Sequence, residues 1–205
     1  MCRKNNEDAY YLAEEDAPLQ HLYIVADGMG MQCRRVASNG AIEAFVDYVA
    51  EHKEIQEIPD LLTGAFQAAN KSVFDQSNSA LEFAEMGTTM VAAVVDNGKS
   101  LCSPCWLTAY LMQKEILNLL TTDHSYVMGT GEIRNHHQRR SGGASKAQYH
   151  HQSCRYQRHS RNGYDHRACG EGDLLLLCTD GLSGMLSDEE MAQMLRQKES
   201  VKRES

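Results

Sequence analysis

The chain has 205 residues, of which 42% are hydrophobic, and a formal net charge of -8. That length and composition fit a single soluble domain with a full core over residues 1–205. The acidic balance argues against a nucleic-acid or anionic-membrane surface, which needs clustered lysine and arginine. No apolar run approaches the roughly 20 residues of a membrane helix, and the first residues do not resemble a signal peptide, so we expect a cytoplasmic protein.

The first half of the chain alternates strand-like and helical patterns. Residues 22–26, LYIVA, are an apolar run closed by an Asp-Gly pair, which predicts a buried strand ending in a turn. Apolar stripes with helical spacing follow over residues 36–52 and 59–74. Residues 86–96, which contain GTTMVAAVVD, are strand-like again.

The last part of the chain repeats this design after an irregular tract. Residues 173–181, DLLLLCTDG, are another apolar run ending in Asp-Gly, and Ser187 with Glu190 forms a capping box that predicts a last helix. Before them, residues 134–168 hold six of the nine histidines but no Leu, Ile, Val, Phe or Met. A structureless segment of that length is unusual inside a compact domain.

Carboxylates stand near the start of the chain and at the ends of both apolar runs. They are Glu7 and Asp8, then Asp27, then Asp180. Oxygen ligands that meet at strand ends suit a hard divalent cation such as Mg²⁺ or Mn²⁺. A single Asp-Gly pair more often only makes a turn, so these residues alone leave a turn and a metal site both open.

Five short motifs along the chain resemble those of a known family. They are RKNNEDA at 3–9, VADGMG at 25–30, MGTT at 86–89, TTDHS at 121–125 and GDLLLLCTDGL at 172–182. Their order and approximate spacing are typical of bacterial members of the metal-dependent protein phosphatase 2C family. The resemblance spans nearly the whole chain.

This resemblance implies an α+β fold in which two antiparallel β-sheets form a sandwich flanked by α-helices, with two Mn²⁺ or Mg²⁺ ions at one end. It implies that Asp27 bridges both ions, that the Gly28 carbonyl binds one, and that Asp180 binds the other. Glu7 and Asp8 would hold metal-bound waters. Two metals about 3.5–4 Å apart lower the pKa of a water and neutralise charge during attack on phosphorus, so no side-chain nucleophile is needed.

The implied activity is hydrolysis of phosphoserine and phosphothreonine in proteins by that activated water. Arg3 would hold the substrate phosphate. The implied partners are phosphorylated proteins made by a serine/threonine kinase, with no nucleic acid and no membrane.

Three windows depart from the family pattern: residues 31–35, 100–108 and about 134–169. They replace Ala-Gly-Glu before a helix, a strand ending in His-Val-Gly-Asp-Ser-Arg, and a segment close to Asn-Ile-Ile-Thr-Arg-Ala-Val-Gly. With suitable synonymous codons, a reading shifted by one base turns residues 32–35 into Asn-Ala-Gly-Glu and restores most of the other two. We therefore interpret the windows as out of frame, since the loss of local consistency is confined to them.

Both ends are expected to be incomplete as well. The family has a strand before the Arg3 motif and, after the last helix, a Gly-x-Asp-Asn motif whose aspartate is another metal ligand. Loss of a ligand should sharply weaken metal binding, so we expect impaired activity in this chain. The alternative is a catalytically inactive phosphatase-like module that binds partners.

The cysteines allow a further alternative. Cys102 and Cys105 could bind zinc with His150 and His151, but the ligand spacing fits no standard module. Cys-x-x-Cys in a thioredoxin-like site would need a helix at its second cysteine. Five of the seven cysteines lie in or beside the three windows, so we interpret them as by-products of the shifted frame.

Overall fold

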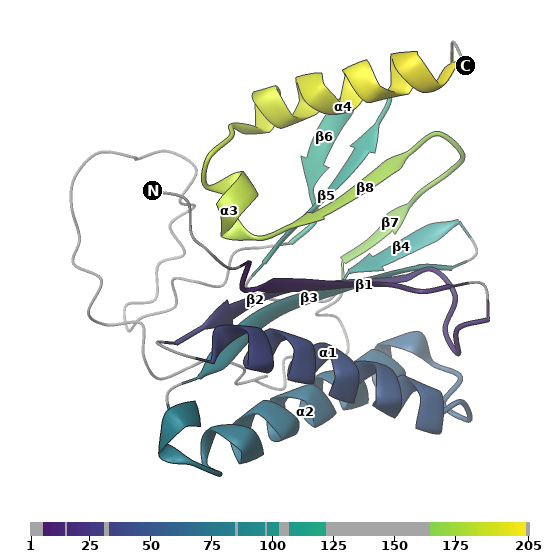
Figure 1. Ribbon diagram of the computed structural model, residues 1–205. Helices are drawn as coiled ribbons and strands as arrows, with labels where there is room; N and C mark the ends of the chain where they lie inside the picture. The colour runs from purple at the N-terminus through teal and green to yellow at the C-terminus, as the bar shows by residue number, and fades with distance from the viewer. Residues whose placement is uncertain are drawn as a thin grey trace, which may run out of the picture.

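Two antiparallel β-sheets lie one above the other, and helices cover the outer side of each (Figure 1). The computed structural model describes residues 6–14, 16–30, 33–84, 86–96, 98–102, 107–121 and 165–203. In the first sheet the strand order is β1 (Asp8–Leu12), β2 (Leu22–Met29), β3 (Gly87–Asp96), β4 (Lys99–Cys102) and β7 (Asp165–Ala168). In the second it is β6 (Ile116–Leu119), β5 (Thr108–Gln113) and β8 (Leu174–Cys178). The expected α+β sandwich is confirmed.

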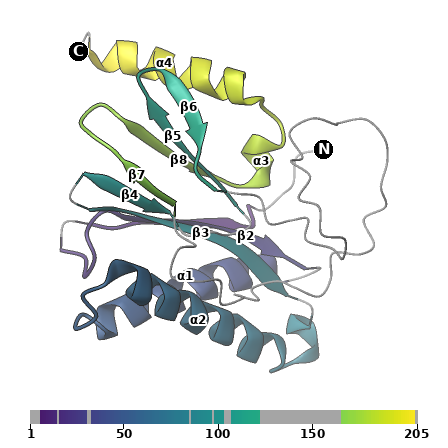
Figure 2. The ribbon, with the colours of Figure 1, turned by 180° about the vertical axis from the view of Figure 1, so that it is seen from behind.

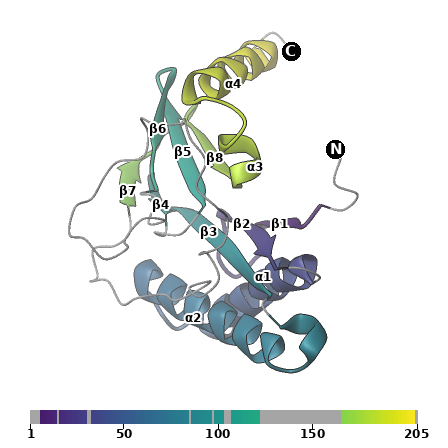
Figure 3. The same ribbon diagram turned by 90° about the vertical axis from the view of Figure 1, so that its left-hand side faces the viewer.

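The helices follow the predicted segments closely. They are α1 (Arg34–Glu51), α2 (Ile58–Ser77), a 3₁₀ turn η1 (Leu81–Phe83), α3 (Asp180–Ser183) and α4 (Asp188–Arg203). Helices α1 and α2 lie side by side under the first sheet, and α4 lies over the second, as the views from behind and from the side agree (Figures 2 and 3).

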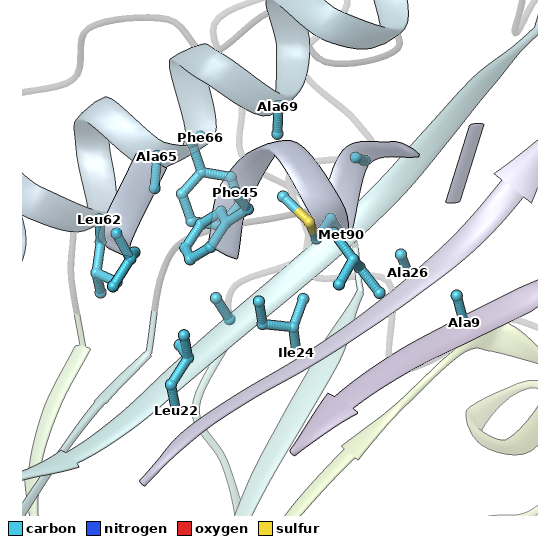
Figure 4. Close-up of a cluster of buried hydrophobic side chains, with 14 of the residues drawn as sticks. Ala9, Leu22, Ile24, Ala26, Phe45, Leu62, Ala65, Phe66, Ala69 and Met90 are labelled. Carbon is cyan, nitrogen blue, oxygen red and sulfur yellow. The ribbon is translucent and has the colours of Figure 1, made fainter. Parts of the chain in front are cut away.

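The first sheet packs on α1 and α2 through a core of apolar side chains (Figure 4). Side chains alternate between the faces of a strand, so Leu22, Ile24 and Ala26 of β2 all point toward the helices. Phe45 of α1 is fully buried and meets Phe66 of α2 edge to face, with ring centroids 5.0 Å apart. Burial of a side chain of this size stabilises the fold by about 1.5–3 kcal/mol.

A second cluster fills the space between the two sheets. Its buried members include Val91 of β3, Cys102 of β4, and Ala109 and Leu111 of β5. Leu177 of β8 packs against them from the second sheet. The sandwich is therefore held by apolar contacts on both sides of the first sheet.

The capping box predicted at the start of the last helix is confirmed. The Ser187 hydroxyl donates to Glu190 Oε2 at 2.7 Å, the Ser187 N–H donates to the same oxygen at 2.8 Å, and the Glu190 N–H donates back to the hydroxyl at 3.3 Å. These bonds from the Ser187 backbone and side chain lower the pKa of Glu190. The helix begins at Asp188, one residue after the capping serine.

One expectation about the first apolar run was wrong. The sequence pattern predicts a strand over residues 22–26 followed by a turn, but β2 continues to Met29 and includes Asp27 and Gly28. The reason is pairing on both sides, because Asp27 lies opposite Asp8 of β1 and Gly28 lies opposite Thr88 of β3. Two ladders extend the strand past residues that would otherwise favour a turn.

The three windows interpreted as out of frame are described only in part. Cys33 is the N-cap residue of α1 and residues 34–35 begin that helix, residues 100–102 lie in β4, and 165–168 form β7, which pairs with β4. Leu107, Thr108 and Cys169 are also described, and Thr108 begins β5. Residues 31–32, 103–106 and 134–164 lie outside the described residues, and the frame interpretation stays a prediction. Within the part of the chain that the structure covers, no helix is long and apolar enough to cross a membrane.

Candidate metal centre

The candidate site lies where β1 begins and β2 ends. Asp8 and Asp27 are directly opposite each other in the antiparallel ladder, so their side chains share one face of the sheet. This face is the one turned away from α1 and α2, because the neighbouring Ala9 and Ala26 point into the helical core. The two carboxylates therefore stand on the side of the first sheet that faces the second sheet.

Two threonines hold the backbone at Asp27. The Thr88 hydroxyl donates to the Asp27 carbonyl at 2.9 Å, and the Thr89 hydroxyl reaches the same oxygen at 3.4 Å. Thr88 is fully buried, so its hydroxyl needs partners within the protein. The MGTT motif thus supports the strand that carries Asp27.

Gly28 permits a close approach between β2 and α1. A Cβ atom placed on Gly28 would lie 2.2 Å from the backbone oxygen of Arg34, well inside van der Waals contact. The Gly28 N–H donates to the Glu7 carbonyl at 3.3 Å, and the Ser38 hydroxyl donates to that same carbonyl at 2.9 Å. Only glycine fits at this position, where β1, β2 and α1 meet.

The second sheet reaches this point through the end of β8. The Thr179 hydroxyl donates to Asp8 Oδ2 at 3.1 Å, a bond between residues 171 positions apart. Asp180 follows directly as the first residue of α3, and it is exposed. The hydrogen bond therefore brings Asp180 to the end of the sandwich that carries Asp8 and Asp27, as the position of α3 beside the start of β1 shows (Figure 1).

Glu7 is engaged by a cation of the chain itself. Arg34 Nη1 lies 2.7 Å from Glu7 Oε2, and Arg34 Nε donates to the Gly30 carbonyl. The Glu7 carboxylate is thus directed toward the start of α1.

The predicted ligands are placed at one end of the molecule, but they do not converge into a closed cluster. Among the described residues, no three His, Cys, Asp or Glu side chains are grouped as a metal site requires. Their chemistry fits a hard divalent cation, since all are oxygen donors on or beside the ends of β1, β2 and β8. The Glu7 carboxylate is paired with the Arg34 guanidinium. Arg3, predicted to hold phosphate, lies outside the described residues.

The cysteines described by the structure behave as packing residues. Cys102 is 1% exposed and belongs to the cluster between the sheets. Burial raises the pKa of the Cys178 thiol, while bonds with Ser183 oppose that rise, so this thiol is protonated and unreactive near neutral pH. Cys105, His150 and His151, which the zinc alternative requires, lie outside the described residues.

Comparison with known proteins supplies the family. The model of the family described as Protein phosphatase 2C matches residues 3–204. The chain belongs to the protein phosphatase 2C family. This phosphatase is 32% identical over 219 residues to "Serine/threonine phosphatase stp" of Listeria monocytogenes serotype 4b, an alignment that covers 97% of this chain and 81% of the relative.

Solved structures agree with this assignment. The phosphatase superposes on the "S. agalactiae serine/threonine phosphatase" with a TM-score of 0.70 and 25% identity, over 95% of this chain and 81% of that one. The catalytic domain of the phosphatase PstP in complex with two manganese ions gives a TM-score of 0.70 and 24% identity, over 96% and 80%. The latter likeness shows the same fold.

Sequence reasoning predicted the carboxylates of the candidate site but missed the side chains that hydrogen-bond to them and to their backbone. Thr88 and Thr179 lie inside motifs quoted from the sequence, and each is a polar residue beside an apolar strand. A polar residue beside an apolar strand is the signal in the sequence that could have indicated a hydrogen-bonding role for each threonine. Arg34 was interpreted only as a product of the shifted frame, and nothing local in the sequence connects it to Glu7, which lies 27 positions away.

Proposed function

We propose that this chain is the catalytic domain of a metal-dependent phosphatase that hydrolyses phosphoserine and phosphothreonine in proteins, with Mn²⁺ or Mg²⁺ as cofactor. Its substrates would be cytoplasmic proteins phosphorylated by a serine/threonine kinase. The observation that carries the proposal is the pairing of Asp8 with Asp27, together with the Thr179 bond that brings Asp180 to the same end of the sandwich.

The residues have distinct tasks in this proposal. Asp27, the Gly28 carbonyl and Asp180 would hold the metal ions, Glu7 and Asp8 would orient water, and Arg3 would bind the substrate phosphate. When bound, two divalent ions lower the pKa of water and neutralise the charge that develops on phosphate.

The protein itself supplies positioning. Thr179 holds one oxygen of Asp8 at 3.1 Å, which fixes the direction of its other oxygen. Thr88 holds the Asp27 carbonyl at 2.9 Å and so fixes the backbone between Asp27 and the Gly28 carbonyl. These bonds prepare the donors before a cation arrives, which lowers the cost of ordering them.

The test is a phosphatase assay on the purified full chain with a phosphothreonine peptide. We expect turnover that requires Mn²⁺ or Mg²⁺ and is abolished by Asp27→Asn, with a rate well below that of an intact family member because of the altered windows. Asp60→Asn, in the first turn of α2 and far from the site, is the matched control. Metal-independent turnover, or full activity of Asp27→Asn, would contradict the assignment.

A second candidate function is an inactive phosphatase-like binding module. The ion pair between Arg34 and Glu7 favours it, because one predicted site carboxylate is already neutralised. This candidate expects phosphopeptide binding that Arg3→Ala weakens, and no turnover at any metal concentration. Robust metal-dependent turnover would refute it, and an intact reading frame through residues 100–168 in the resequenced gene would refute the out-of-frame interpretation.

A further inference from the structure

Arg34 places a positive charge against a residue of the candidate metal centre. Its Nη1 lies 2.7 Å from Glu7 Oε2, and the two side chains are only 32% and 27% exposed. Partial burial reduces solvent screening, so this pair is stronger than a typical surface ion pair. Its Nε also donates to the Gly30 carbonyl, so the guanidinium is held at two points.

The position of Arg34 in its helix makes this arrangement informative. Arg34 is the first residue of α1, where the helix dipole disfavours a positive charge. The first turn of α1 has no acidic residue, and Cys33 gives no side-chain cap. Glu7 and the Gly30 carbonyl are therefore the groups that offset the unfavourable charge.

We propose that Arg34 acts as an internal cation that draws Glu7 away from its proposed task of orienting metal-bound water and thereby lowers the metal affinity of this phosphatase. This inference rests on the metal site proposed above. The pair with the guanidinium takes up part of the acceptor capacity of Glu7 Oε2 and orients the carboxylate toward Arg34. A fixed positive charge beside the site also repels an incoming divalent cation.

The altered window at residues 31–35 is the source of this charge. Read in the shifted frame, residues 32–35 become Asn-Ala-Gly-Glu, which replaces Arg34 with glycine and Arg35 with glutamate. The start of α1 would then carry a negative charge, which the helix dipole favours, and Glu7 would lose its competing partner. The ion pair thus depends on the residue that this chain carries at position 34, and it would be absent in the shifted frame.

The direct test is a calorimetric titration of the full chain with Mn²⁺, in the absence of substrate. We expect Arg34→Gln to raise the affinity for Mn²⁺ on the order of tenfold, equivalent to ~1.4 kcal/mol. Arg35 is the next residue along the chain, and it is exposed. Arg35→Gln therefore removes one positive charge that solvent already screens, and it should change the affinity for Mn²⁺ by less than about twofold. Arg34→Met, also uncharged, replaces Arg34→Gln if that variant does not fold.

Three results separate the possible failures. If wild type binds Mn²⁺, Asp27→Asn abolishes binding and Arg34→Gln has the wild-type affinity, the internal-cation inference is overturned while the metal site stands. Equal effects of Arg34→Gln and Arg35→Gln overturn it too, since they would reflect net charge alone. If no variant binds Mn²⁺, the metal site itself is refuted.

The ion pair has a readout that needs no metal. Urea unfolding of wild type, Arg34→Gln, Glu7→Gln and the double variant, all without metal, gives the coupling between the two side chains. We expect the double variant to be more stable than the sum of the single effects predicts. Additive effects would show that the pair contributes nothing, and the inference would fail.

Discussion

Gly28→Ala is the substitution for which the structure makes the sharpest prediction. The added Cβ would lie 2.2 Å from the Arg34 backbone oxygen, 2.6 Å from its carbonyl carbon and 3.0 Å from its Cα. All three are backbone atoms, so no side chain can rotate to relieve the contact. Either β2 or the start of α1 must shift by about 1 Å to restore a normal carbon-to-oxygen separation, a forced backbone movement of the kind that overpacking produces.

The expected cost is near the upper end of the range for overpacking, about 2–3 kcal/mol. Gly28 lies in β2 opposite Thr88 of β3, and its N–H donates to the Glu7 carbonyl at 3.3 Å, so a shift there disturbs several bonds together. Urea unfolding should show a midpoint lower by about 0.7–3 M, given slopes of about 1–3 kcal/mol/M for small proteins.

Gly40→Ala is the matched control for this measurement. A Cβ at Gly40 would meet only the end of the Gln76 side chain, at 3.2 Å, which can move. Gly40 lies inside α1, where alanine is favoured over glycine by up to about 1 kcal/mol. Gly40→Ala should therefore be neutral or stabilising. A Gly28→Ala variant as stable as wild type would show that β2 and α1 do not approach as closely as described.

Two further predictions concern polar bonds that link distant parts of the chain. Thr179→Val removes the donor to Asp8 at 3.1 Å and should weaken Mn²⁺ binding roughly tenfold. The control Thr63→Val, in α2, should leave the affinity for Mn²⁺ unchanged. If calorimetry gives Thr179→Val the same affinity as wild type, Thr179 does not position Asp8. Tyr110→Phe removes a 3.0 Å bond to Asp188 that ties β5 to α4, and should lower the free energy of unfolding by about 1 kcal/mol. Burial and the bond to Asp188 raise the pKa of Tyr110 above its usual 10.0, so the stability due to this phenol is complete below pH 10 and is lost as the pH rises further; this alkaline loss should be smaller in Tyr110→Phe.

Local patterns were sufficient for most secondary structure. The Ser187 and Glu190 capping box depends on groups three residues apart, so it could be recognised without the fold. The apolar stripe of α1 likewise depends only on helical spacing. The end of β2 could not be predicted in this way, because the ladders with β1 and β3, rather than its own residues, extend it through Asp27 and Gly28.

The sequence by itself determined the family and most of the strand and helix segments, and it predicted the carboxylates that a metal ion would use, because all of these depend on short motifs and regular spacing. Only the tertiary structure decided how those carboxylates are held. Thr88 reaches Asp27 across 61 positions, Thr179 reaches Asp8 across 171, and Arg34 reaches Glu7 across 27. Such bonds form only when sheets and helices pack, since folding brings together side chains whose separation in sequence carries no periodic signal.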